Sequence, residues 1–493
     1  MFGGEVLQAP IIDESALSVV RVLYGVLLTL TLIGAIPHAK RYFISEKWGG
    51  YGHSHWSVAA IQNPIVFPCV LGLWILSALW LTFGWWVVPA AFVNLILCRY
   101  FFVQMRWKGI LRGMGAPGFL TFWLGAAVFV LEYTHRYAPQ LSSLALLVLQ
   151  IDFALIFLSA GIYKFTSGYR SNDGMELGLV NPQWGYWFKL WRSVPPNHWI
   201  FWILNQLAWT TEVIGAVLML IPQTRFVGGM LILFSFIFIA SQIRLGFLCE
   251  MVIVACLLFV SQDSFGAEWV SSASSLLVDR TSLKLPTVLV DVLNQILMVG
   301  LWMYLLLLPI ARAGLAYNFY LRKRLPAFLQ SVLDKYTNAC GIIIWRVFSA
   351  DITNFFINVY ERQIAGGEER LISRWGYIGT LRYNQVAESI TVTSIFTTLK
   401  YYASNRRLFI ERLLRYARTV SHYPGVILRF EYVSIVKQSN QFEFVPIVNY
   451  QVDLDKDEVT ETTVSSVVSV QEAAHTSPVH EGQRPGSYTP EHN

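Results

Sequence analysis

Long apolar stretches alternate with short polar connections along the first 310 residues of the chain. The stretches are about 18 to 24 residues long, which is the length that a helix needs to cross a hydrocarbon core of about 30 Å. We predict transmembrane helices at 16–37, 65–83, 86–104, 119–133, 141–165, 203–222, 227–242, 247–262 and 288–310. The pattern thus predicts an all-α polytopic membrane bundle of eight or nine transmembrane helices, because the last short pair, 227–262, could also form one bent or re-entrant unit.

The pattern changes after residue 310, where the sequence predicts a small mixed α+β soluble region. Residues 405–420 carry apolar residues on one side of a helix and arginines elsewhere, so we expect an amphipathic helix docked on the membrane or on its own domain. Residues 426–435 and 442–452 are rich in β-branched and aromatic residues and predict a hairpin. We divide the chain into a transmembrane bundle (1–265), a loop with the last transmembrane helix (266–311), a soluble C-terminal region (312–452) and a disordered tail (453–493).

Composition and charge support a membrane class and predict its sidedness. Of the 493 residues, 55% are hydrophobic and 14% are charged, whereas charged residues make up about 25% of soluble domains. The net charge of +6 comes largely from basic residues near the span ends, so no nucleic-acid partner is expected. These residues gather on the side that carries the C-terminal region, which the positive-inside rule places in the cytoplasm. The opposite side has only Arg136, Arg225, Arg280 and Lys284.

Charged and polar side chains inside the predicted spans are the place to look for chemistry. A charge at the centre of a bilayer costs about 2.5 to 3.5 kcal/mol on insertion scales, so it persists when it is paired, hydrated or functional. Arg21 could anchor the first span to headgroups or pair with an acid such as Asp291. We predict an intramembrane polar network of Arg21, Asp152, Asn205, Arg244, Glu250 and Asp291.

Lys164 and Glu212 are the candidate reactive pair. Lys164 lies near the end of its span, where a lysine can extend to the headgroups. If it instead faces Glu212, it could form a structural bridge or act as a base with a lowered pKa. His53 and His55 have no convincing third ligand nearby in the sequence, so no metal site is expected.

Part of the fifth span resembles a known family. The string Phe157-Leu158-Ser159-Ala160-Gly161-Ile162-Tyr163-Lys164-Phe165, followed by Asp173-Gly174, resembles a motif of the horizontally transferred transmembrane (HTTM) family, the membrane part of vitamin K-dependent gamma-carboxylase. Further matches are Arg21-x-x-Tyr24-Gly25, Glu212 within an apolar span, and Arg244-Leu245-Gly246-Phe247. The resemblance covers about residues 15–265.

The resemblance implies a catalytic base at Lys164 with Glu212 as its candidate partner, because the matching lysine of the carboxylase deprotonates a hydroquinone. It would also imply a reduced, lipid-soluble quinone as cofactor. Tyr163 stands where the carboxylase has a second lysine, and the histidine nearest to the third and fourth spans is His135 at a span end. The carboxylase keeps its C-terminal domain in the lumen, whereas the charges of this chain predict a cytoplasmic C-terminal region.

Three functions are compatible with these features. An accessory role in the maturation, export or immunity of another polypeptide, as in relatives within the family, requires a binding surface on the C-terminal region. A membrane enzyme resembling the carboxylase requires Lys164 to be buried in a cavity that opens to lipid. A transporter would need inverted repeats and broken helices, and no repeat is evident. The expected partners are the lipid bilayer and either a protein or a lipid-soluble substrate.

Overall fold

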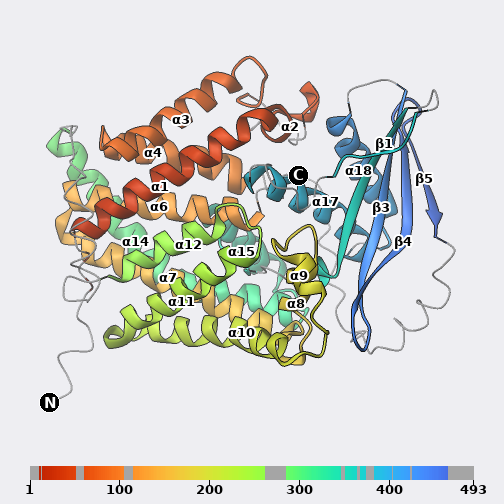
Figure 1. The fold of residues 1–493 in the computed structure, drawn as a ribbon. Coiled ribbons are helices and arrows are strands. Elements are labelled where there is room, and N and C mark those ends of the chain that lie inside the picture. Colours follow the sequence, from red (N-terminus) through yellow and green to blue (C-terminus); the bar gives the residue numbers. More distant parts are fainter. Residues whose placement is uncertain are drawn as a thin grey trace.

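The structure is a computed structural model. It describes residues 10, 12, 14–50, 60–104, 115–260, 285–345, 350–363, 367–373, 382–401, 403–421 and 425–464. Figure 1 shows a bundle of long helices with a small β-sheet at one end. His53 and His55, where the sequence predicts no metal site, lie outside the described residues.

Each predicted span falls on a helix in the described part of the chain. These helices, which we call the bundle, are α1 (Glu14–Ala35), α3 (Phe67–Phe83), α4 (Val87–Cys98), α6 (Gly115–Tyr137), α7 (Pro139–Thr166), α10 (Trp199–Leu220), α11 (Arg225–Gln242), α12 (Leu248–Cys256) and α14 (Thr287–Tyr320). Six stretches of the described chain are long and apolar enough to cross a membrane, namely 14–43, 87–104, 139–166, 199–220, 222–242 and 287–320. The helices at 67–83 and 248–259 are apolar but shorter. The fold is therefore compatible with an integral membrane protein, with six membrane-length helices where the sequence predicts eight or nine spans.

The structure adds two details to the sequence prediction for the bundle. Helices α11 and α12 pack against each other, and the apolar stretch of α12, 248–259, is shorter than the membrane-length helices, so both the pair of spans and the bent or re-entrant unit stay predictions. The last helix, α14, continues ten residues beyond the predicted end at residue 310. Its side chains Asn294, Tyr304 and Arg312 bond to α6 and α7, which attaches α14 to the other helices of the bundle along much of its length.

The helices run back and forth between two ends of the bundle. Figure 1 shows α1 beginning at the end far from the sheet and running toward it. Short elements extend from the sheet-side ends, and they are η1 (Ile36–His38), α2 (Ala39–Phe43), η2 (Glu46–Trp48), a π-helical turn (Arg99–Gln104), η5 (Tyr169–Ser171), α8 (Met175–Val180) and α9 (Phe188–Arg192). At the far end lies η6 (Pro222–Thr224) between α10 and α11, while η7 (Leu257–Phe259) extends α12. The basic residues Arg41 and Arg192 lie on the sheet side and Arg136 and Arg225 on the far side, as the charge pattern predicts. Which side faces the cytoplasm stays a prediction.

The C-terminal domain, as we call residues 355–464, contains a five-stranded antiparallel sheet in the order β2-β1-β3-β4-β5. The strands are β1 (Phe355–Gln363), β2 (Arg370–Leu371), β3 (Val426–Lys437), β4 (Phe442–Asp453) and β5 (Glu458–Thr463). The predicted hairpin is present as β3 and β4, with an irregular register next to Tyr432 and Val433. Strand β5 falls within the segment 453–493, so the predicted tail begins too early; residues 465–493 lie outside the described part.

Two helices, α17 (Arg382–Tyr401) and α18 (Arg406–Val420), cover one face of the sheet. The predicted amphipathic helix is α18, which begins after Asn405 because that side chain accepts a hydrogen bond from the Leu408 N–H. The apolar side of α18 packs on its own domain, since Phe409 and Leu413 are buried with Phe430 of the sheet. On its other face, Phe442 and Phe444 at the bundle end pack on Phe201 of α10 and Arg192 of α9, and the rest of this face carries no helix of the described chain (Figure 1).

Candidate functional site

Lys164 and Glu212 form an ion pair between α7 and α10. The Lys164 ammonium donates a hydrogen bond to Glu212 Oε1, and the two side chains are only 6% and 2% exposed. The prediction that Lys164 extends to the headgroups is therefore wrong, because the side chain is buried against an acid. The second carboxylate oxygen, Glu212 Oε2, has no hydrogen-bond partner in the described structure.

A close helix contact brings this pair together. A Cβ atom at Gly161, one turn before Lys164, would lie 2.6 Å from Val213 Cγ2 and 3.1 Å from the Trp209 carbonyl oxygen. Small residues of this kind let two helices in a membrane approach closely. The short distance between α7 and α10 at Gly161 lets Lys164 reach Glu212.

A second cluster lies two turns away on the same face of α10, around Asn205. Asn205 donates from Nδ2 to Glu176 Oε2 at 2.6 Å and accepts from the Met175 N–H at 2.8 Å. Glu176 on α8 is fully buried, and its other oxygen pairs with the ammonium of Lys437 on β3. Lys437 also bonds to Asp173 Oδ1 at 2.6 Å. A lysine of the C-terminal domain thus neutralises a buried acid of the bundle.

Tyr169 connects the two clusters. Its side chain is fully buried, and burial, followed by the nearby charges of Glu212 and Glu176, raises the pKa of its phenol. Its ring packs on Gly174, where a Cβ atom would come within 2.5 Å. The polar groups therefore continue from Glu212, past Tyr169 and Glu176, to Lys437 at the surface of the C-terminal domain.

Asp152 lies at the centre of a third buried network. Its Oδ2 accepts hydrogen bonds from Trp123 Nε1 and Tyr304 Oη, both at 2.8 Å, and its Oδ1 pairs with Arg312 at 2.9 Å. Arg312 also donates to the Ile343 carbonyl oxygen at 3.0 Å. Asp152 thereby joins α6, α7 and α14. Hydrogen-bond donors and the Arg312 guanidinium satisfy both of its carboxylate oxygens, so its role is to hold these helices together.

The remaining predicted network residues do not come together. Arg21 is buried and pairs with Glu132 at 3.3 Å, so neither a headgroup anchor nor a bond to Asp291 is correct. Asp291 is exposed in the second turn of α14. Glu250 is half-buried in the first turn of α12. The predicted set of six therefore separates into distinct clusters and single side chains.

Arg244 organises the turn that carries a further polar anchor, Asn181. Its Nη1 donates to the Pro182 carbonyl oxygen and its backbone N–H to the Trp184 carbonyl oxygen, both at 2.8 Å. From the same turn, Asn181 donates to the carbonyl oxygens of Thr353 and Phe355, at 2.9 and 2.8 Å. This turn fixes the start of the C-terminal domain to the bundle.

Sequence reasoning missed Glu176, Lys437 and Arg312, which complete the buried clusters. Glu176 lies in a connection where charge is ordinarily solvated, and Lys437 lies at the end of a hairpin strand. A signal for Arg312 was available, because the apolar pattern of α14 continues past residue 310 with Leu315 and Tyr317.

Comparisons with models of known protein families, with curated proteins and with solved structures found no match. The assignment of chemistry to this chain therefore rests on its own residues and their geometry.

Proposed function

We propose that this chain is a multi-pass membrane protein of the HTTM type with an accessory role in the maturation, export or immunity of another polypeptide. The observation that carries the proposal is a sheet with a free edge and with one face that is uncovered beyond its bundle end, held firmly on a membrane bundle (Figure 1). In the described part of the chain, β5 pairs with β4 on one side only. An exposed strand edge of this kind accepts an extended segment of another polypeptide through main-chain hydrogen bonds.

The uncovered part of this face is preorganised for polar contacts. Arg429 donates to Glu369 at 2.6 and 2.8 Å and to Asn449 Oδ1 at 2.8 Å, and its guanidinium lies 3.9 Å from the centre of the Tyr360 ring. Asn358 donates to Glu431 Oε2 at 2.9 Å beside this group. Side chains that are already held in place lose little conformational freedom when a partner binds.

Rigid attachment of the domain supports the same role. Buried bonds from Asn181, Gln183 and Glu176 reach the C-terminal domain or the segment leading into it, and Arg41 of α2 pairs with Glu388 of α17. The sheet is therefore fixed at the membrane surface, where a polypeptide that is crossing or leaving the membrane would meet it.

Site-specific photo-crosslinking in the native cell tests this function. A photoreactive amino acid replaces Thr460, exposed on β5, and in a matched control it replaces Arg407, whose side chain on α18 is 89% exposed. We expect a recurring polypeptide adduct at Thr460 and none at Arg407. Deletion of the gene should leave that same polypeptide immature or unexported. Equal adducts at both positions, or normal maturation of the polypeptide in the deletion strain, would contradict the accessory role.

A membrane enzyme resembling the carboxylase is the second candidate, supported by the buried pair of Lys164 and Glu212. A base that deprotonates a hydroquinone needs an amine that is free to reach the substrate, and Lys164 Nζ is engaged with Glu212 Oε1. The arrangement does not provide a free base, so we derive no step through a quinol. A transporter remains the third and weakest candidate.

A further inference from the structure

Helix α15 (Ala327–Cys340) lies beside the sheet-side end of α14. Leu333 packs over Gly314, where a Cβ atom would lie 2.9 Å from Leu333 Cδ2, and Asn318 donates to Gln330 Oε1 at 3.0 Å. Between the two helices runs Arg322-Lys323-Arg324. Since α14 is long and apolar enough to cross a membrane, α15 begins where the chain leaves it.

Three sides of α15 have different chemistry. Successive residues turn by about 100° around a helix. Leu333 and Thr337 are buried and face α14 and its neighbours. Phe328, Leu329 and Val332 are 77%, 51% and 50% exposed and form an apolar side. The polar residues form a third side, centred about 135° around the helix from the apolar one, and they are Gln330, Ser331, Asp334, Lys335 and Asn338.

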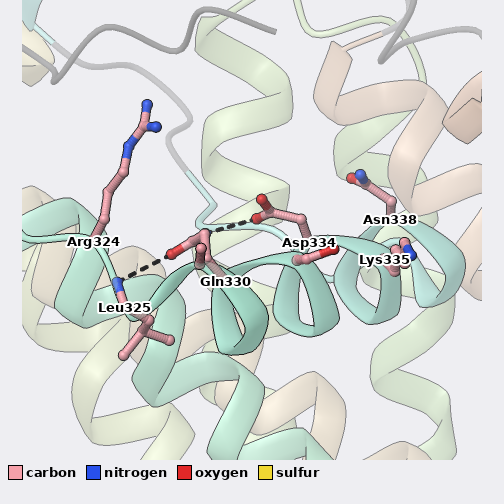
Figure 2. Close-up of a pocket in the computed structure, with 8 residues that line it drawn as sticks. Arg324, Leu325, Gln330, Asp334, Lys335 and Asn338 are labelled. Carbon is pink, nitrogen blue, oxygen red and sulfur yellow. Dashed lines mark hydrogen bonds between the residues drawn. The ribbon is translucent and has the colours of Figure 1, made fainter. Parts of the chain in front are cut away.

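A cavity of about 470 Å³ lies over this polar side and is open to solvent. Its lining residues are Arg324, Leu325, Ala327, Gln330, Ser331, Asp334, Lys335 and Asn338. Figure 2 shows Arg324, Asp334 and Asn338 extending from the same side of the chain, with Gln330 between them. Gln330 donates to Asp334 Oδ1 at 2.9 Å and accepts from the Leu325 N–H at 3.3 Å, which fixes the floor of the cavity.

We propose that α15 lies in the membrane–water interface and that this cavity binds the headgroup of an anionic phospholipid. Exposed Phe328, Leu329 and Val332 would enter the acyl region, as the apolar side of an interfacial helix does. The polar side then turns toward the headgroup layer. There the Arg324 guanidinium and the Lys335 ammonium supply charge for a phosphodiester, to which a guanidinium can donate two parallel hydrogen bonds.

The neutral polar groups complete the match. Ser331 and Asn338 line the same cavity and can hydrogen-bond a glycerol or phosphate oxygen. Asp334 opposes an anion, so its charge limits affinity for a phosphate. The direction of this effect can be tested, because removing the Asp334 carboxylate should strengthen binding of an anionic headgroup. The inference is independent of the proposed accessory function and of the Lys164 pair.

Native mass spectrometry of the full chain in a zwitterionic detergent tests the site, with phosphatidylglycerol as the probe and phosphatidylcholine as its neutral comparison. We expect tighter binding of phosphatidylglycerol. In a variant with Arg324→Gln and Lys335→Gln, that binding should weaken by at least about tenfold, because each basic residue near an anionic surface contributes appreciably. The matched variant Arg322→Gln with Lys323→Gln loses the same charge beside the cavity, and it should change binding by less than about threefold.

Two further measurements complete the test. Asp334→Asn should strengthen phosphatidylglycerol binding, and Lys335→Arg should keep it. Equal binding of the two lipids, equal loss in both double variants, or displacement of the lipid by millimolar inorganic phosphate would each overturn the proposal. The last outcome would assign the cavity to free phosphate instead.

Discussion

Lys437 on β3 neutralises Glu176 on α8, a fully buried side chain 261 positions away in the sequence. This pair joins the C-terminal domain to the bundle. Removing one partner of a buried ion pair leaves the other charge uncompensated, which is more costly than losing the pair as a whole.

We expect Lys437→Ala to destabilise the chain by about 3 to 5 kcal/mol, since it leaves the Glu176 carboxylate buried and without its ammonium partner. Thermal unfolding of the purified full chain measures this loss. Lys456→Ala is the matched control, because Lys456 pairs with Asp453 at 3.1 Å at the surface. Adding Glu176→Gln to Lys437→Ala should recover part of the stability. Equal melting temperatures for the two lysine variants would show that the buried pair does not hold the domain.

A double substitution distinguishes the two roles of the Lys164–Glu212 pair. Glu212→Leu alone leaves a buried ammonium, and Lys164→Met alone leaves a buried carboxylate, so each should cost several kcal/mol. The two together should be close to the wild type in stability, which a double-mutant cycle measures. If the pair is structural, the Thr460 crosslink persists in the double variant. Loss of function with normal membrane insertion and stability would instead support a catalytic lysine.

Asp152→Asn should weaken the attachment of α14, because Arg312 loses its carboxylate while Trp123 and Tyr304 keep only a neutral acceptor. We expect a loss of about 3 to 5 kcal/mol from the unpaired arginine. Asp291→Asn is the control, because Asp291 lies on α14 and is exposed. Its effect on the free energy of unfolding should stay within about 0.5 kcal/mol. Unfolding in detergent and protease sensitivity near residue 285 measure both variants. A similar effect of the two substitutions would contradict the central place of Asp152.

The outer face of the sheet should loosen in acid. Hydrogen bonds from Arg429 hold the pKa of Glu369 below its usual range. A lowered carboxyl pKa gives stability that is complete above the ordinary value of about 4.3 and is lost as the pH falls through the lowered one. Both side chains are partly exposed, so the contribution is about 0.2 to 1 kcal/mol. Hydrogen exchange in β1, corrected for intrinsic rates, should accelerate below pH 4.3 by up to about fivefold in the wild type and not in Glu369→Gln. An identical acceleration in both chains would exclude this pair as its cause.

The sequence predicts local features of this fold well because each depends on a short pattern. The helix at Arg406–Val420 and the hairpin of β3 and β4 follow from periodicity and turn residues. The pairing of Lys164 with Glu212 was one of several alternatives, since two spans with polar faces can be rotated and stacked in many ways. The close contact at Gly161 selects among them.

Long-range partners could not be predicted from one sequence. Arg21 had several acids within reach in principle, and it pairs with Glu132 because α1 packs on α6. Lys437 lies on a strand that alone would leave it in solvent. It meets Glu176 only because the hairpin leans on the bundle, where Phe442 packs at 5.8 Å from Phe201. Such contacts depend on tertiary packing, which a local pattern does not contain.

Sidedness is tested by cysteine labelling in a chain in which Cys69, the exposed cysteine among those described, is replaced by serine. Glu14→Cys at the start of α1 and Thr460→Cys on β5 lie at opposite ends of the molecule (Figure 1). The positive-inside rule predicts that a membrane-impermeant maleimide labels Glu14→Cys in intact cells and Thr460→Cys only after permeabilisation. The reverse result would put the C-terminal domain on the lumenal or external side, as in the carboxylase, and would give it access to exported rather than cytoplasmic polypeptides. Labelling of both from one side would contradict the prediction of nine crossings, because an odd number of crossings between these two positions would place them on opposite sides of the membrane.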